Sequence, residues 1–213
     1  VPIIALTATA IPEVRKDIAL QLKLSEPREF VGSFNRKNLQ YRVLPKKNSW
    51  TTLLNYVQQH KDESGIIYCL SKKETEDIAE KLQKSGFKAI AYHAGLSKDI
   101  REKVQDEFIH DNVNIVCATI AFGMGIDKPD VRFVIHYVMP KSIESYFQET
   151  GRAGRDGEDS ECILLYSRGD YGKIRALIEG DESDERYIRL SLRKLQDMID
   201  YCESPLCRRK FLL

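Results

Sequence analysis

The sequence of 213 residues has little net charge and no long hydrophobic run. Its 33 Lys and Arg residues balance 32 Asp and Glu residues, which excludes a uniformly basic protein that coats nucleic acid, so any anion-binding site must be local. No apolar run approaches the roughly 18–20 residues that a membrane span requires, and no segment resembles a signal peptide. We therefore expect no membrane partner.

Cysteine is scarce as well. Five cysteines are too few for a disulfide scaffold. Cys69, Cys117 and Cys162 each lie inside a short apolar run that is typical of a buried strand, so we expect reduced thiols in the core. Reduced thiols predict a cytosolic or nuclear protein.

Two common nucleotide-binding patterns are also missing. GxxxxGK[ST] does not occur, so the chain has no phosphate-cradling loop of its own. No Asp-Glu pair follows an apolar strand to hold magnesium. A nucleotide site, if present, must be built mostly by another domain.

The residues that are present predict an α/β fold with a mainly parallel sheet. Short apolar runs alternate with amphipathic stretches, and continuously apolar strands are typical of parallel sheets covered on both faces. The expected strands are 65–70, 87–92, 114–118, 132–137 and 161–166, and the expected helices are 11–24, one capped by Ser71 and Glu74, one capped by Ser97, 142–149, 170–179 and 185–201.

The first 48 residues are less regular. Residues 1–10 have the pattern of a buried strand, and residues 25–48 mix strand-like pieces with a polar turn. We place a domain boundary near residues 32–36. Because the chain begins in a strand pattern and stops in a helix pattern, we expect it to be part of a longer protein.

The stretch QETGRAGRDG (148–157) sets Arg152 and Arg155 among three glycines. Each glycine inside a helix costs roughly 1 kcal/mol, and a helix that continued through them would place both arginines on one face. Guanidinium groups on so bare a backbone are suited to phosphate oxygens, as in an arginine finger. The alternative is a solvated loop with structural ion pairs.

Polar residues also follow the expected strands, at the edge of the sheet where ligands gather. Beyond Thr119, Gly123 and Gly125 would let amides approach a phosphate, and Asp127 could accept a sugar hydroxyl. The alternative is a plain turn punctuated by Lys128-Pro129-Asp130. We expect His136, on a strand, to be structural.

Four of these segments, in order, resemble the RecQ family of superfamily 2 DNA helicases. QETGRAGRDG resembles motif VI, and residues 118–136 resemble motif V. GIIYCLSKKETE with AYHAG resembles the motif IV region, and LTATA (6–10) resembles motif III. The likeness covers essentially the whole chain.

The resemblance implies a RecA-like domain of the P-loop NTPase type followed by a helical subdomain. Residues 1–33 would be the tail of a first RecA-like domain, residues 34–167 the second RecA-like domain, and residues 168–213 the start of a zinc-binding subdomain. A free-standing chain of this kind should show no appreciable ATPase and at most weak DNA binding.

The activity that the resemblance implies is ATP-dependent 3′-to-5′ DNA unwinding, in DNA repair and recombination. ATP and Mg²⁺ would be bound mainly by the first RecA-like domain, and the partner would be single-stranded and partially duplex DNA. The location would be the nucleoid of a bacterial cytoplasm or a eukaryotic nucleus. Arg155 would be the arginine finger and Arg152 a second phosphate or interdomain contact. The other implied nucleotide contacts are Asp127, Gly125 and Gln148, and the implied DNA contacts are Ser71, His93, Gly95, Thr119, Met124 and Lys128.

Cys207 matches the first of four zinc-ligating cysteines in the family. Cys202 lies five residues earlier and is expected to pack within a helix. Two cysteines cannot build a closed Cys₄ site, so Cys207 would be a Zn²⁺ ligand in the longer protein and a free thiol here.

Two other functions fit the sequence less well. A DEAD-box RNA helicase usually carries His-Arg where this chain has Gln148-Glu149. A non-catalytic nucleic-acid or protein-binding module could keep the motor fold, although intact Arg152 and Arg155 argue against it.

Overall fold

The computed structural model describes residues 3–7, 12–32, 35–119, 122, 127–181 and 184–212. The chain divides into two compact units, residues 1–36 and 37–213.

The first unit contains helix α1 (Pro12–Gln21), which confirms the helix expected over residues 11–24. The expected buried strand is wrong for residues 3–7, which form no strand, and Ile4 and Leu6 are 83% and 90% exposed. An apolar run forms a strand only where a neighbouring strand satisfies its backbone, and the described residues of this unit include none. The rest of the predicted motif III, residues 8–10, lies outside the described residues.

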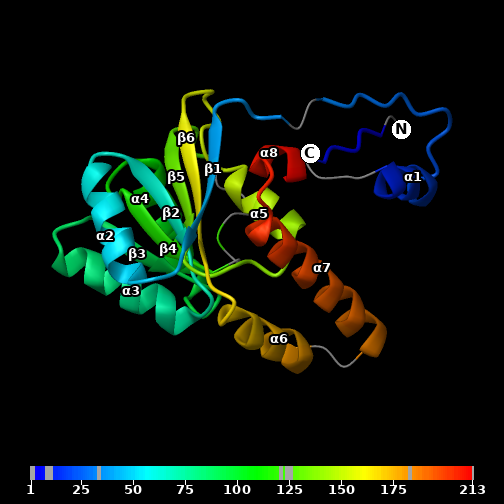
Figure 1. Cartoon of the computed structure of the whole chain (residues 1–213). Coiled ribbons are helices and arrows are strands. Elements are labelled where there is room, and N and C mark those ends of the chain that lie inside the picture. Colours follow the sequence, from blue (N-terminus) through cyan, green and yellow to red (C-terminus); the bar gives the residue numbers. More distant parts are fainter. Residues whose placement is uncertain are drawn as a thin grey trace. The chain divides into compact units, whose positions relative to one another are not determined.

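The second unit is built on a six-stranded parallel sheet (Figure 1). Its strand order is β1-β6-β5-β2-β4-β3, and every neighbouring pair is parallel. The predicted α/β fold is therefore confirmed. The strands are β1 (Leu39–Pro45), β2 (Ser64–Tyr68), β3 (Ala89–Tyr92), β4 (Ile115–Ala118), β5 (Val131–His136) and β6 (Ser160–Tyr166).

Helices cover both faces of this sheet, which is why its central strands carry apolar residues at consecutive positions. Ile66 of β2 packs in a cluster with α4, while the next residue, Ile67, packs in a cluster with α2 and α3. Both are fully buried. The helices are α2 (Ser49–Gln59), α3 (Lys72–Lys84), α4 (Lys98–Ile109), α5 (Ile143–Thr150), α6 (Asp170–Asp181), α7 (Glu185–Glu203) and α8 (Arg208–Leu212).

Both predicted helix caps are present. Ser71 Oγ accepts the Glu74 amide at 3.1 Å, and Ser97 Oγ accepts the Ile100 amide at 3.3 Å. The Glu74 carboxylate accepts the amide of Leu70 at 2.8 Å, one residue before the position that a capping box requires. It thereby ties the end of β2 to the start of α3.

The three C-terminal helices and α5 share one hydrophobic cluster, in which α7 packs against both α5 and α6. Tyr146 of α5 and Tyr201 of α7 are fully buried in one cluster, with ring centroids 5.3 Å apart. The two helices expected over residues 170–179 and 185–201 are confirmed as α6 and α7.

The predicted burial of Cys69, Cys117 and Cys162 is confirmed, and Cys202 packs within a helix as expected. Cys207 is exposed. Burial raises the pKa of the Cys69 thiol well above its usual value. No helix in the described part of the chain is long and apolar enough to cross a membrane.

Candidate functional site

The segment with the two arginines is a series of turns and does not continue the helix. Helix α5 ends at Thr150, and Gly154 adopts a left-handed φ of 53° that no α-helix accommodates. The shared helical face considered for Arg152 and Arg155 therefore does not arise. Their positions depend instead on how residues 151–157 are attached to the sheet; we call these residues the arginine segment.

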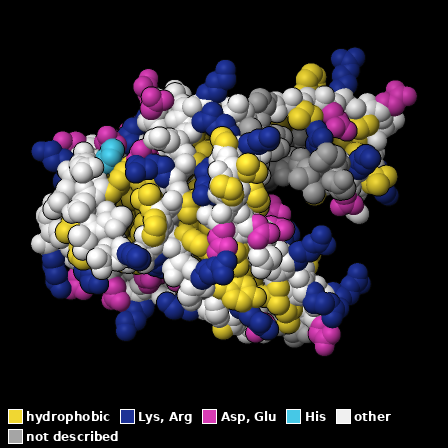
Figure 2. Space-filling view, viewed as in Figure 1, with side chains coloured by type: hydrophobic (Ala, Val, Ile, Leu, Met, Phe, Trp, Pro, Cys, Tyr) yellow, Lys and Arg dark blue, Asp and Glu magenta, His cyan; other side chains and the backbone are white. Residues whose placement is uncertain are grey.

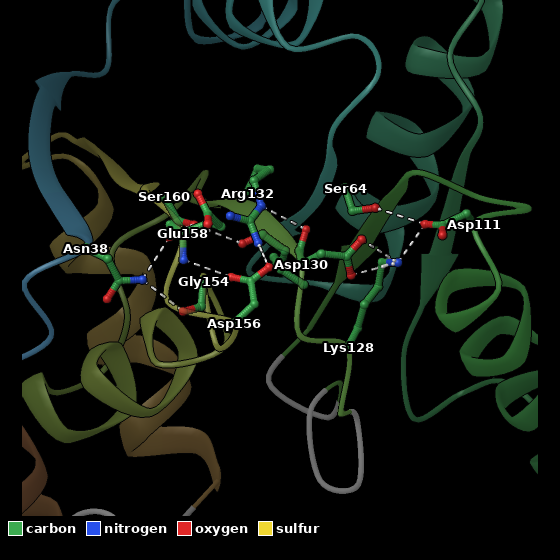
Figure 3. Close-up of polar contacts among 11 residues, drawn as sticks. Asn38, Ser64, Asp111, Lys128, Asp130, Arg132, Gly154, Asp156, Glu158 and Ser160 are labelled. Carbon is green, nitrogen blue, oxygen red and sulfur yellow. Dashed lines mark hydrogen bonds and ion pairs between the residues drawn. The ribbon is translucent and has the colours of Figure 1, made fainter.

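The arginine segment is attached to the amino ends of β5 and β6 (Figure 3). The Gly154 amide donates to the Val131 carbonyl at 2.8 Å, and the Asp156 amide donates to the Pro129 carbonyl at 3.2 Å. Ala153 is fully buried in the same hydrophobic cluster as Ile66 of β2. These contacts leave the backbone on either side of Arg155 little freedom.

The glycine at 154 is required by neighbouring protein atoms. A Cβ at this position would lie 2.5 Å from Asn38 Nδ2 and 2.7 Å from both the Glu158 carbonyl and Ser160 Oγ. The sequence-based interpretation, that the bare backbone admits a ligand, is wrong at Gly154. Around Gly157, whose φ is 92°, a Cβ would meet no atom within 4 Å.

Asp156 belongs to the attachment as well. Its carboxylate accepts a hydrogen bond from Arg132 of β5 and, at 3.1 Å, from the amide of Glu158. The hydrogen bond from Arg132 holds the pKa of Asp156 below its usual value. Asp156, the acidic neighbour of Arg155, therefore forms hydrogen bonds within the fold.

Arg155 forms an ion pair with Asp127. Arg155 Nη1 lies 2.9 Å from Asp127 Oδ1, and the two side chains are 34% and 89% exposed. The structure therefore brings together two residues predicted to contact the same nucleotide. Exposed ion pairs of this kind contribute about 0–1 kcal/mol, so a phosphate oxygen can replace the carboxylate at little cost.

Arg152 is half-buried beside Tyr68 of β2. Burial raises the pKa of the Tyr68 phenol, and the Arg152 guanidinium opposes that rise. The Tyr68 hydroxyl donates to the Phe122 carbonyl at 3.1 Å. Arg152 is therefore linked to the loop predicted as motif V. Gln148 is exposed on α5, while Gly123, Met124 and Gly125 lie outside the described residues.

A buried pair fixes the end of α5 from which the arginine segment starts. His136 Nε2 and Glu149 Oε2 are 2.6 Å apart, with side chains 1% and 7% exposed. The Tyr68 ring stacks on His136 at 5.2 Å between centroids. The structural role expected of His136 is confirmed.

A second group of predicted residues lies at the carboxyl ends of β2, β4 and β3. The Thr119 amide donates to the Tyr92 carbonyl at 3.2 Å, which joins the ends of β4 and β3. Ser71 begins α3 just beyond β2, and the buried His93 pairs with Glu76 of α3 at 3.0 Å. Ser71, His93, Gly95 and Thr119 therefore share one edge of the sheet.

Sequence reasoning missed one cation at this edge. A Cβ on Gly95 would lie 3.2 Å from Lys72 Nζ, so this exposed ammonium stands beside the His93–Gly95 turn. The available signal was a lysine at the first position of a helix that follows a buried strand.

Lys128 requires a correction. It is predicted as a DNA contact, but its side chain is 2% exposed and its ammonium lies 2.6 Å from Asp111 and 3.1 Å from Asp130 (Figure 3). Burial lowers the pKa of Lys128, but the hydrogen bonds to the two carboxylates outweigh that effect and leave it above the usual value. Lys128 therefore stabilises the fold and is unavailable to a phosphate.

The surface carries no single-sign field on the face shown in Figure 2, where basic and acidic side chains are interspersed. This agrees with the net charge of +1. Any anion-binding site must therefore be local, at individual cations such as Arg155 and Lys72.

Taken by itself, Cys207 has the properties of a metal ligand. Backbone N–H groups of Lys210 and Arg209 lower the pKa of its exposed thiol, which favours the thiolate that zinc binds. Among the described residues, no group of three or more His, Cys, Asp or Glu is placed to hold a metal ion. A tetrahedral site would need three ligands besides Cys207.

Two protein families match the sequence. Residues 46–157 match the helicase conserved C-terminal domain, and residues 168–213 match the RecQ zinc-binding family.

Individual proteins match over the full length of the chain. It is 51% identical to the "RecQ-like DNA helicase BLM" of Xenopus laevis, covering 100% of this chain and 16% of the relative. It is 49% identical to the "ATP-dependent DNA helicase RecQ" of Pasteurella multocida, covering 100% of this chain and 33% of the relative. The chain thus spans a third or less of these relatives. Among solved structures, a DEAD box protein from Methanococcus jannaschii is similar, with a TM-score of 0.59 and 30% identity over 80% of this chain and 47% of that one.

Proposed function

Because this chain belongs to the RecQ family and carries its helicase conserved C-terminal domain, we propose that it is one half of an ATP-driven DNA motor. In the complete protein it supplies arginines to a nucleotide that another RecA-like domain holds. The observation that carries the proposal is the exposed ion pair of Arg155 and Asp127 in a chain without a phosphate-binding loop.

On the nucleotide side, the residues fit the terminal phosphates of ATP. Arg155 exchanges Asp127 for a γ-phosphate oxygen when the two motor domains close, and the released carboxylate is free to accept a ribose hydroxyl. Arg152, Gln148 and Gly125 complete the proposed contacts. Bound Mg²⁺ would neutralise charge on the phosphates, and its ligands would come mainly from the other domain.

On the nucleic-acid side, single-stranded DNA crosses the carboxyl ends of β2, β4 and β3. The proposed contacts are Ser71, His93, Gly95, Thr119 and Met124, to which the structure leads us to add Lys72. Backbone amides and an ammonium recognise phosphates and not bases, so binding should depend strongly on salt and little on sequence.

The domain plan follows the same proposal. Residues 34–167 form the second RecA-like domain and residues 168–213 begin a zinc-binding subdomain with Cys207 as one ligand. The division of the chain after residue 36 supports the first boundary. The protein would act where DNA is processed, in the nucleoid of a bacterium or the nucleus of a eukaryote.

The alternatives are an RNA motor of the DEAD-box kind and a non-catalytic module. The identities of 49–51% to proteins named as DNA helicases, against 30% for the DEAD box structure, favour the DNA motor.

ATP hydrolysis by the complete protein and by the 213-residue chain alone tests the proposal. We expect single-stranded DNA to stimulate the complete protein and the chain alone to show no turnover. Turnover by the chain alone would contradict a shared nucleotide site. Stimulation by RNA and not DNA would favour the first alternative, and no stimulation by either would favour the second.

A further inference from the structure

Asn38 holds both ends of the loop that carries Arg155. It precedes β1, and its side-chain Nδ2 donates to the Gly154 carbonyl at 2.9 Å and to the Glu158 carbonyl at 2.8 Å (Figure 3). An amide NH₂ has two hydrogens, so one donates on each side of Arg155. The backbone carbonyl of Asn38 accepts a hydrogen bond from the backbone amide of Ser160 at 2.9 Å, which anchors Asn38 to β6.

The backbone of Asn38 is held in turn by the C-terminal helix. Arg209 of α8 donates from Nη2 to the Leu39 carbonyl at 2.7 Å and to the Lys37 carbonyl at 3.3 Å. These two carbonyls flank Asn38. A guanidinium binds in a fixed planar geometry, so α8 sets the backbone from which the Asn38 side chain reaches the loop.

Asn38 packs closely against the loop between Gly154 and Glu158. At Gly154, even a methyl group would come within 2.5 Å of Asn38 Nδ2. The same loop carries Arg155, whose guanidinium must lie beside the charge that develops during phosphoryl transfer in order to stabilise it. Misplacement of a catalytic group by about 1 Å can cost about 100-fold in rate, so such an attachment affects turnover.

We propose that Asn38 is a positioning residue for Arg155, and that Arg209 keeps Asn38 in place. The inference rests on the proposed function, because it assigns Arg155 to the nucleotide. It links the start of the second RecA-like domain and the zinc-binding subdomain to the arginine segment through named hydrogen bonds.

The experiment measures DNA-stimulated ATP hydrolysis by the complete protein with Asn38→Asp, which keeps the size of the side chain but removes both donors. We expect kcat to fall about 10- to 100-fold, while KM for ATP and the affinity for single-stranded DNA change less than about threefold. Asn55→Asp, an exposed position on α2, makes the same change of charge and should leave kcat unaltered. If Asn38→Asp does not fold, Asn38→Ala decides the question, since it places no charge between the two carbonyls.

A double substitution separates positioning from general damage. Adding Asn38→Asp to Arg155→Ala should cause no further loss of kcat, because residues that act as a unit are not additive. A further loss equal to that of Asn38→Asp alone would overturn the proposal, as would an unchanged kcat in the single variant. If Arg155→Ala lowers kcat and Asn38→Asp does not, the inference fails alone. If neither substitution affects kcat, the assignment of Arg155 in the proposed function fails as well.

Discussion

Substituting Gly154 by alanine should destabilise the fold, because two independent costs meet at this position. A residue with a Cβ pays roughly 1–2 kcal/mol in the left-handed conformation that Gly154 adopts, with φ of 53°. The new methyl group would also displace Asn38, whose two hydrogen bonds contribute about 1 kcal/mol each. The sum is a loss of about 3–4 kcal/mol in the free energy of unfolding.

Urea unfolding of the chain, followed by circular dichroism, measures this loss as a lower midpoint with an unchanged slope. Gly172→Ala is the matched control, since Gly172 lies within α6 and a Cβ there would meet no atom within 4 Å. It should be neutral or stabilising by up to about 1 kcal/mol. An unchanged midpoint for Gly154→Ala, combined with lost nucleotide binding by the complete protein, would refute the structural explanation and restore the ligand-based one.

Three further substitutions test the other attachments. His136→Leu leaves the buried Glu149 without its partner and should cost about 3–5 kcal/mol in urea unfolding; a loss below about 1 kcal/mol would contradict the pairing. Hydrogen bonds, chiefly from Arg168, lower the pKa of Glu203 from 4.5 to about 2, so the stability that this carboxylate contributes is present above pH 4.5 and is lost as the pH falls towards 2. Glu203→Gln should therefore make the free energy of unfolding depend less steeply on pH between 4.5 and about 2. Lys128→Met should lower stability by about 0–1 kcal/mol for each of the two ion pairs that it removes, because both carboxylates are exposed to water, yet change the DNA affinity of the complete protein less than about twofold; a large loss of affinity would restore Lys128 as a DNA contact.

The parallel sheet could be predicted because its signal is local. A strand covered on both faces needs apolar residues at consecutive positions, as Ile66 and Ile67 show. The edge strand β1 is less clear, since it alternates burial along LQYRVLP and pairs Arg42 with Glu161 of β6 at 3.4 Å. A strand with one neighbour has polar positions, so its pattern resembles that of a loop.

The arginine segment could be identified as a candidate site for a similar reason, because its composition is unusual within ten residues. The residues that hold it in place could not be predicted. Asn38 and Gly154 are 116 residues apart in sequence, and Arg209 and Leu39 are 170 apart. No local pattern marks such pairs, and an asparagine or an arginine in isolation is typical of any surface.

Lys128 shows the opposite error. The sequence Lys-Pro-Asp has the composition of an exposed turn, and a lysine near a proposed phosphate site suggests a phosphate contact. Its ion-pair partner Asp111 is 17 residues away, just beyond the end of α4. Charge alone therefore did not distinguish a ligand contact from a buried ion pair.

The central claim is that Arg155 acts on a nucleotide held by another domain. The most direct test measures ATP affinity and turnover separately in the complete protein with Arg155→Ala, with Arg175→Ala, an exposed position paired with Glu179 in α6, as the control. We expect the ATP Kd to change less than about threefold and kcat to fall by about 100-fold or more, while the control retains both values. An unchanged kcat for Arg155→Ala would contradict the claim and leave Arg155 a structural residue paired with Asp127.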